Sequence, residues 1–273
     1  MSRKSEERDT LGTALKASEG VEAQRKCPDN KPLIVRLDGR AFHSFTNGLD
    51  KPFDMRLVEL MRQTTRYLVK ELGAAIGYTQ SDEITLIWYV PEESESQLPF
   101  GGRFQKMASI AAALASVFFG KALEHHLPIK KAHMPIFDGR AWAVDSLREA
   151  YLNLLWRKRD AIKNSITMLA LSHFSHNELH GVGSSAKLQM LRDVGDPWED
   201  YKDSVRQGSY FARVTELTEL PPETLEKIPA QYRPEGPIER SFVKEVSPMI
   251  EIEDETDENI IKMFENRFTT KAG

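Results

Sequence analysis

The order of apolar patterns between residues 32 and 144 constrains the fold more than any other feature of this sequence. Two helical patterns alternate with stretches rich in β-forming residues, and Asp54 and Gly73 are typical of the N-cap and C-terminal cap of the first helix. In chain order the segments are a strand at 32–37, a helix at 54–73, two strands within 74–90 around a tight turn near Gln80–Glu83, a helix at 103–126, and one strand or two short ones within 132–144. This β-α-β-β-α-β order is the ferredoxin-like, or split βαβ, pattern, with strand order 4-1-3-2. The sequence predicts an α+β fold in which the first and third strands are central neighbours.

Three regions follow from this pattern. Residues 1–29 are polar and are expected to form an exposed N-terminal arm, and residues 30–145 contain the predicted β-α-β-β-α-β unit. Residues 146–174 read as one long helix, and the signals beyond it are weaker. We expect 146–273 to form a helical and C-terminal α/β extension that completes the same globular unit.

Acidic residues lie at the point where two predicted central strands meet. The first strand runs directly into Asp38 and Gly39, and the third strand starts at Asp82 and Glu83. Carboxylates side by side repel each other unless a cation neutralises them, and Mg²⁺ prefers oxygen ligands of this kind. Gly39 would let its backbone carbonyl approach such an ion. The alternative is that both segments are ordinary solvated turns.

A phosphate-binding element is a second candidate. Arg103 and Lys106 lie three positions apart at the start of the second predicted helix, directly after two glycines. The alternative is an exposed basic turn with no ligand.

Composition excludes several classes of protein. With one cysteine, Cys27, the 273-residue chain can form no internal disulfide, and a cysteine-based zinc site is unlikely on residue types. The first ten residues lack the apolar core of a signal peptide, and no uncharged apolar run is long enough to cross a membrane. We therefore expect a cytoplasmic protein with no membrane partner. The net charge of −4 gives weak evidence against nucleic-acid binding, because a basic face can occur in an acidic chain.

Six motifs in consistent order carry a family resemblance between about Leu33 and Arg213. They are "VRLDGRAFHSFT", "KPFD", "GYTQSDEITLIW", "GGRFQK", "FDGRAW" and "LWRKRDAIKNS". The chain resembles the tRNA-His guanylyltransferase family and its template-dependent relatives, the 3′–5′ nucleotide-adding polymerases. The resemblance implies a polymerase-like palm of ferredoxin-like topology with two Mg²⁺ ions, or Mn²⁺ in their place.

The resemblance also implies roles for individual residues. It makes Asp38, Asp82 and Glu83 catalytic, with Asp38, the Gly39 carbonyl and Asp82 as metal ligands. The implied nucleotide-binding residues are Gly39, Arg40, Ala41, Phe42, His43, Lys51, Ser81, Arg103 and Lys106. The expected tRNA contacts are Arg157, Lys158, Arg159, Lys163, Asn164 and Lys187, for which an ordinary solvated helix surface is the alternative.

The implied reaction starts with activation of a tRNA 5′-monophosphate by ATP or GTP. The 3′-hydroxyl of a further NTP then attacks the activated end and pyrophosphate leaves. Where eukaryotic members carry a "HINNLY"-type sequence, this chain has "AIKNSIT", with Ile162 in place of the histidine. "SHFSHNELHG" is instead similar to the bacterial and archaeal branch. This favours templated repair of tRNA 5′ ends over untemplated G addition to tRNA-His, and a homo-oligomer, often a tetramer, is expected.

Two rival functions remain open: a nucleotidyl cyclase on the same palm, and a tRNA-binding protein without catalysis. Three histidines, His173, His176 and His180, are more typical of a substrate-proximal loop or a solvated surface than of a zinc site. Asp138 repeats the Asp-Gly-Arg pattern and is interpreted as structural. The acidic run 251–260 is interpreted as a solvated face or tail.

Overall fold

The computed structural model describes residues 3–92, 94, 96–248 and 250–264. Its helices are α1 (Arg3–Ala23), α2 (Phe42–Phe45), α3 (Met55–Leu72), α4 (Phe104–His126), α5 (Leu147–His173), α6 (Ser184–Asp193), α7 (Asp203–Arg206), α8 (Pro222–Glu226) and α9 (Asp257–Phe264). Its strands are β1 (Leu33–Gly39), β2 (Ile76–Gln80), β3 (Glu83–Trp88), β4 (Phe137–Ala143), β5 (Ser209–Thr218) and β6 (Ile238–Val246). Short 3-10 turns, η1 to η4, lie at Pro99–Gly102, Pro128–Lys130, Trp198–Asp200 and Ala230–Tyr232.

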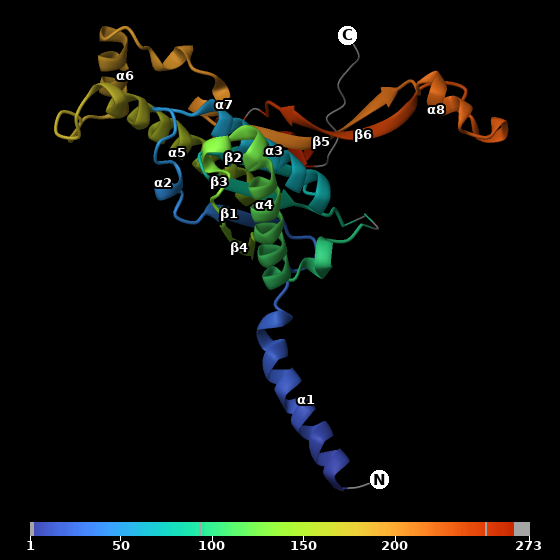
Figure 1. The fold of residues 1–273 in the computed structure, drawn as a ribbon. Helices are drawn as coiled ribbons and strands as arrows, with labels where there is room; N and C mark the ends of the chain where they lie inside the picture. Colours follow the sequence, from blue (N-terminus) through green and yellow to red (C-terminus); the bar gives the residue numbers. More distant parts are fainter. Residues whose placement is uncertain (1–2, 93, 95, 249, 265–273) are drawn as a thin grey trace.

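All six strands form one sheet in the order β4-β1-β3-β2-β5-β6, with antiparallel neighbours throughout. The first four strands follow the predicted 4-1-3-2 order, and 132–144 contains one strand, β4. Strands β5 and β6 continue the same sheet beyond β2. Figure 1 shows that β5 and β6 also extend away from the body as a long arm that carries α8, while α1 projects in another direction.

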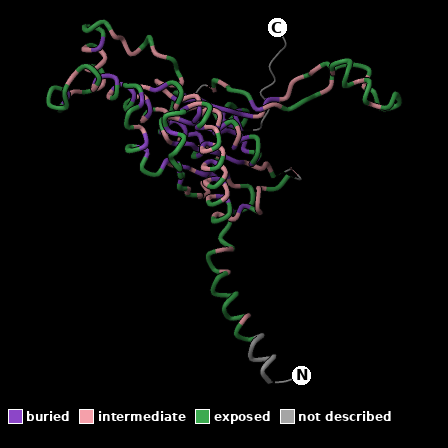
Figure 2. Tube along the Cα trace, viewed as in Figure 1, coloured by how far each residue is buried: buried purple, intermediate pink, exposed green. Residues whose placement is uncertain are grey.

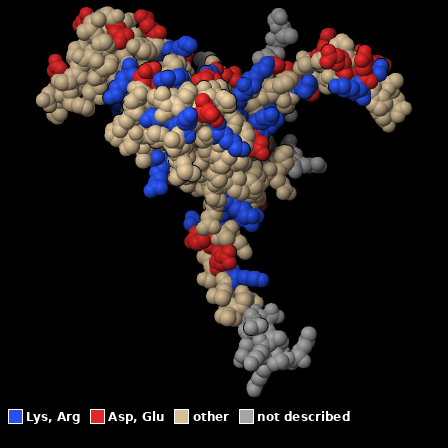
Figure 3. Space-filling view, viewed as in Figure 1, with Lys and Arg blue, Asp and Glu red and all other residues tan. Residues whose placement is uncertain are grey.

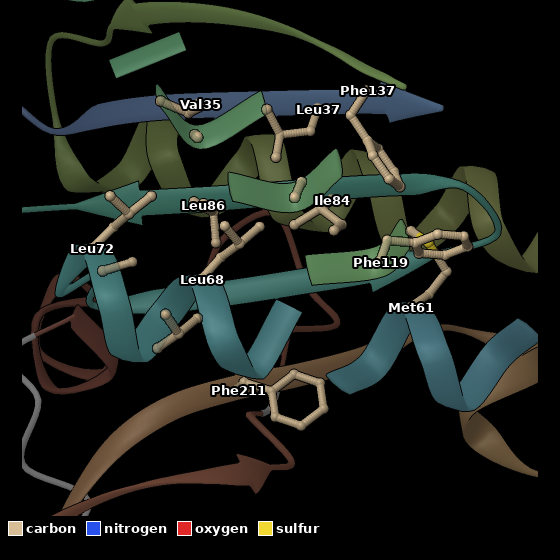
Figure 4. Packing of buried hydrophobic residues seen from close by; sticks show 14 of the residues in the cluster. Val35, Leu37, Met61, Leu68, Leu72, Ile84, Leu86, Phe119, Phe137 and Phe211 are labelled. Carbon is tan, nitrogen blue, oxygen red and sulfur yellow. The ribbon is translucent and has the colours of Figure 1, made fainter. Parts of the chain in front are cut away.

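Alternation along β1 decides what each face of the sheet packs against. Leu33, Val35 and Leu37 join the core cluster formed with α3 and α4, whereas Ile34 joins the cluster formed with α5 and α9 on the other face. Figure 4 shows the first cluster, with Val35 and Leu37 among side chains from β3, α3 and α4. Buried residues concentrate at the sheet, and α1 and the end of the β5–β6 arm are largely exposed (Figure 2).

Helix α3 begins and ends as its sequence predicts. Asp54 is its N-cap and accepts a hydrogen bond from the Arg56 backbone N–H at 2.9 Å, and Gly73 follows the last turn with a left-handed φ of 64°. The Arg56 side chain also donates to the Asp54 carboxylate, which lowers the pKa of Asp54 to about 2.

Helix α4 is the one helix in the described part of the chain that is long and apolar enough to cross a membrane. Its buried stripe runs from Met107 to Leu123 and packs against β1, β4 and α3, as expected for a core helix. Packing on the sheet therefore explains the buried stripe of α4.

Candidate active site

Three carboxylates lie in a row across three neighbouring strands, β4, β1 and β3, at one edge of the sheet. The register places Asp38 on β1 directly opposite Glu83 on β3 and directly opposite Asp138 on β4. Residues that face each other in antiparallel strands share one side of the sheet, so these side chains belong to the side on which α5 packs. The predicted meeting of the end of β1 with the start of β3 is confirmed.

Asp82 completes the acidic group from the turn before β3. Its backbone carbonyl accepts a hydrogen bond from the Gly39 N–H at 3.1 Å, which ties the turn to the end of β1. Burial raises the pKa of the Asp82 carboxyl, and the neighbouring charge of Asp38 raises it further. The ionised form of Asp82 is therefore short of compensating positive charge in the protein alone.

The residues at this point fit a hard divalent cation. Asp38, Asp82 and the Gly39 carbonyl offer oxygen donors only, and two carboxylates plus substrate phosphates are a common set for Mg²⁺. In the described part of the chain, no group of three or more His, Cys, Asp or Glu side chains is arranged to hold a metal ion. A cation at Asp38 and Asp82 would therefore depend on substrate oxygens for the rest of its ligands.

Close packing explains the glycine at position 39. A Cβ on Gly39 would lie 2.4 Å from the Phe42 ring, which is itself buried beside Phe45, Phe119 and Phe137. The prediction that the Phe42 side chain lines a nucleotide pocket is corrected, because this ring belongs to the hydrophobic core. Arg40, Ala41 and His43 around it are exposed.

Glu83 has a partner that the sequence did not reveal. Its carboxylate accepts two hydrogen bonds from the buried Arg157 guanidinium, both at 2.7 Å, and lies 3.5 Å from Arg36. The charge of Glu83 is thus neutralised within the protein. Glu83 was expected to be catalytic, and its contacts are instead those of a residue that positions the strand end beside Asp38. Arg157 was expected on an exposed basic stripe, and this placement is wrong because the residue is 8% exposed.

Arg36 is a functional candidate that the sequence reasoning missed. It lies on β1 two residues before Asp38 on the same side of the sheet, and burial lowers the pKa of its guanidinium. Its buried Nε and Nη2 have no hydrogen-bond partner. A charged residue inside an otherwise apolar strand was the available signal.

Asp138 was interpreted as structural, yet it faces Asp38 from β4 and is exposed. The repeated Asp-Gly-Arg pattern was the signal for this position. Asp138 therefore joins the candidate site.

Of two other predicted nucleotide-binding residues, Ser81 contacts the acidic group. Ser81 is in the β2–β3 turn with a φ of 49°, and its side chain hydrogen-bonds Asp82. Lys51 is exposed in the segment between α2 and α3.

Arg103 and Lys106 lie at the start of α4, which packs on the face of the sheet opposite to the Asp38 side chain. The start of α4 pairs with residues 25–27, because the Cys27 N–H donates to the Gly102 carbonyl and the Phe104 N–H donates to the Arg25 carbonyl. Residues 25–27 precede the start of β1, whereas Asp38 lies near its end. Figure 1 shows α4 beginning close to the point where α1 joins the body.

The predicted tRNA-binding cations have different surroundings. Lys158 lies 3.6 Å from Glu251 and Arg159 pairs with Glu253, so the acidic run lies along α5 as an exposed face, within the solvated face or tail that was expected. Lys163 and Asn164 are exposed farther along α5. Lys187 on α6 donates to the Thr167 hydroxyl at 3.1 Å.

The three histidines do not form a metal cluster among the described residues. His173 lies 2.6 Å from Asp196, which also accepts a hydrogen bond from Tyr201. His176 and His180 are exposed.

Comparisons with known proteins show which family this chain is similar to. The family model described as tRNAHis guanylyltransferase (Thg1) matches residues 14–145. A solved bacterial tRNA(His) guanylyltransferase (Thg1)-like protein in complex with ATP is 33% identical, with 74% of this chain and 88% of that chain covered and a TM-score of 0.70. A similar bacterial protein in complex with GTP is 28% identical, with coverages of 86% and 90% and a TM-score of 0.66.

Among curated proteins, the tRNA(His) guanylyltransferase of Schizosaccharomyces pombe is 29% identical over 137 residues. That match covers 49% of this chain and 51% of the yeast protein. The sequence motifs, the fold and these similarities lead to one assignment: the chain belongs to the tRNAHis guanylyltransferase (Thg1) family of nucleotidyltransferases.

Proposed function

We propose that this enzyme uses Mg²⁺ to add nucleotides in the 3′–5′ direction to the 5′ end of tRNA, with templated repair of truncated ends as its main activity. The observation that carries the proposal is the convergence of Asp38 and Asp82 at the joined ends of β1 and β3. The order β4-β1-β3-β2, with α3 and α4 packed on one face, supports a ferredoxin-like palm as the scaffold.

The chemistry of the site follows from the placement of its side chains. Asp38, Asp82 and the Gly39 carbonyl would hold the metal, which would stabilise the negative charge on the attacking and leaving oxygens. Arg157 keeps Glu83 in place beside Asp38, so the acidic row, formed by Asp138, Asp38 and Glu83, has a fixed geometry. The Arg36 guanidinium, 3.5 Å from Glu83, adds a largely buried positive charge close to Asp38.

The reaction proceeds in two balanced steps. The tRNA 5′-phosphate attacks the α-phosphorus of ATP or GTP, and pyrophosphate leaves. The 3′-hydroxyl of the incoming NTP then attacks the activated 5′ phosphorus, loses its proton, and displaces AMP or GMP. Arg40 and His43 are exposed beside Asp38 and are proposed to contact the incoming nucleotide.

The proposal includes assembly of several copies of the chain. Arg103 and Lys106 lie at the start of α4, on the face of the sheet opposite to Asp38, so we propose that the triphosphate role implied for them involves a separate nucleotide or a neighbouring subunit. The surface over α4 is also nearly free of charged side chains (Figure 3), and Val117 in its middle is 56% exposed. Both observations support a homo-oligomer, for which a tetramer is the expected form. The expected cytoplasmic location stays a prediction.

The test supplies 5′-phosphorylated tRNAs that lack one 5′ nucleotide, with the opposing base varied, together with all four NTPs and Mg²⁺. We expect the added nucleotide to follow Watson–Crick pairing, and we expect Asp38→Asn to abolish addition. G addition whatever the opposing base would contradict templated repair and favour the tRNA-His activity.

The same reactions separate the rival functions. A cyclic nucleotide formed without RNA would establish a cyclase in place of a tRNA-modifying enzyme. Binding of tRNA without any addition, unaffected by Asp82→Asn, would establish a non-catalytic tRNA-binding protein.

A further inference from the structure

An exposed tryptophan lies next to the candidate active site. Trp156 on α5 is 55% exposed, whereas Trp88 on β3 is buried in the core as expected. The Arg157 guanidinium carbon lies 4.6 Å from the centre of the Trp156 ring, and that of Arg36 lies 5.4 Å from it. A large apolar ring on the surface, contacted by two guanidinium groups, needs a ligand that tolerates both.

The surroundings of Trp156 form a hollow of about 410 Å³ on the surface of α5. Its apolar wall consists of Trp156, Leu152 and Leu155, and its polar rim consists of Arg148, Arg159, Glu253 and Asp254. Arg148 and Arg159 are held by the acidic segment, since Arg148 donates to the Glu253 and Glu255 carbonyls and Arg159 pairs with Glu253. The hollow therefore has fixed sides and an apolar face of the kind that a flat ring can cover.

Trp156 is connected to the acidic row through both of its cationic neighbours. Arg157 holds Glu83, which is opposite Asp38, and Arg36 precedes Asp38 by two positions on the same side of the sheet. Arg36 also lies 5.4 Å from the Trp142 ring, so its guanidinium carbon lies close to both indoles. A nucleotide stacked on Trp156 would thus lie one side chain away from the proposed reaction centre.

We propose that Trp156 is a stacking platform for an unpaired nucleobase of the tRNA substrate, with Arg36 and the exposed Arg140 supplying positive charge for the adjoining phosphates. This inference rests on the proposed function. Proteins bind unpaired RNA bases by stacking them on aromatic side chains among basic residues, and this needs no sequence-specific contact. The Arg140 side chain is 63% exposed and can reach phosphate oxygens from the strand next to Arg36.

Base and phosphate could also come from a free NTP. RNA fits better because a small ligand is usually largely enclosed by its pocket, whereas more than half of Trp156 is open to solvent. The two sources are separated by measuring the affinities for tRNA and for NTP independently.

The experiment measures tRNA affinity in the Asp38→Asn background, so that no nucleotide addition is needed for the readout. Trp156→Ala is compared with Trp156→Phe and with Tyr232→Ala, a control on the arm whose side chain is 71% exposed. We expect Trp156→Ala to weaken tRNA binding by about tenfold, within the roughly 5- to 150-fold range of one stacked base. Trp156→Phe should retain part of the affinity that Trp156→Ala loses, because phenylalanine also stacks on a base. Tyr232→Ala should leave the affinity for tRNA unchanged.

A second arm replaces each unpaired tRNA nucleotide in turn by an abasic one. One such replacement should weaken binding to the protein with Trp156 intact, but not to the Trp156→Ala variant, because the two changes remove the same contact. Circular dichroism and thermal unfolding establish that the variants are folded.

Three results would overturn the inference. The first is unchanged tRNA affinity in Trp156→Ala, or no tRNA binding by the parent protein. The second is an equal loss of NTP affinity without tRNA, which would assign the platform to the free nucleotide. The third is a change of mass in solution for Trp156→Ala, which would make this face an interface between copies. Trp156-dependent binding together with absent nucleotide addition would contradict only the proposed function.

Discussion

At the scale of single residues, the site combines one uncompensated carboxylate with one fully compensated one. Burial and the nearby Asp38 raise the pKa of Asp82, while Glu83, the next residue, is held by two hydrogen bonds from Arg157. Adjacent acidic residues therefore have different roles. Asp82 is suited to bind a cation, and Glu83 is suited to fix the end of β3 against α5.

Replacing Asp82 by Asn should separate metal binding from folding. Asp82→Asn removes a metal ligand, so we expect activity to fall by at least about 100-fold, since metal stabilisation of the reacting oxygens is worth several kcal/mol. Added Mg²⁺ with nucleotide should raise the Tm of the parent protein but not of Asp82→Asn, and EDTA should reverse this rise. Differential scanning fluorimetry and the nucleotide-addition assay measure the two effects. Retained Mg²⁺ stabilisation in the variant would contradict the ligand role.

Breaking the Glu83–Arg157 pair should cost stability. Glu83→Ala removes both hydrogen bonds to the buried Arg157 guanidinium and leaves it only the ion pair with Asp160 at 3.3 Å, so we expect the free energy of unfolding to fall by about 3 kcal/mol. Glu251→Ala is the matched control, because its carboxylate is 66% exposed and its pair with Lys158 should contribute less than about 1 kcal/mol. Urea unfolding measures both. Equal, small losses would contradict the structural role of Glu83.

At the scale of elements, helix ends and strand ends position the site. The cap of α3 fixes where the chain resumes after α2, and the turn between β2 and β3 brings Asp82 to the end of β1. Helix α5 then crosses the opposite face and supplies both Arg157 and Trp156. The acidic segment 251–255 holds α5 in turn, because Arg148 donates to its carbonyl groups and the Tyr151 hydroxyl donates to the Ile252 carbonyl at 2.9 Å.

The cap of α3 gives a pH-dependent prediction. Asp54→Ala should lower the free energy of unfolding by about 1 kcal/mol at pH 7, because the first turn loses its acceptor. The Arg56 hydrogen bond lowers the pKa of Asp54 from 3.8 to about 2, so its contribution is present above pH 3.8 and is lost as the pH falls through about 2. The difference between the two proteins, measured by denaturant unfolding, should therefore shrink in strong acid. Asp50→Ala, whose exposed carboxylate lies 3.3 Å from the same arginine, is the control and should change little.

At the scale of the whole molecule, charge and shape are distributed unevenly. The net charge is −4, yet acidic residues of the C-terminal segment cover cations on α5, and the surface over α4 is largely uncharged (Figure 3). Helix α1 and the β5–β6 arm extend from the body in different directions (Figure 1). A protein with these features has surface available for contacts with further copies of the chain and with a large substrate.

The assembly is testable at the middle of α4. Val117→Lys places a charge on the apolar surface and should lower the mass of the oligomer in solution, because burial of an unpaired lysine is unfavourable. Leu217→Lys is the control, since Leu217 is a 71% exposed apolar residue on the β5–β6 arm. Size-exclusion chromatography with light scattering measures the mass. A parent protein that is monomeric, or an unchanged mass in Val117→Lys, would contradict assembly through α4.

The sequence by itself determined the order of the elements, the caps of α3 and the meeting of the end of β1 with the start of β3. These features depend on local signals: the periods of strands and helices, N-cap and C-cap residues, and a ferredoxin-like order that allows few strand arrangements. The ordered motifs then made the family recognisable, although no single motif was specific.

Only the tertiary structure decided which side chains pair across the fold. The partner of Glu83 is Arg157, 74 positions along the chain, and Asp138 faces Asp38 because β4 happens to pair with β1 in that register. The distance of Arg103 from Asp38 likewise depends on the direction in which α4 crosses the sheet. Such contacts follow from long-range packing, and a local pattern of residues carries no information about which distant charge will neutralise a given carboxylate.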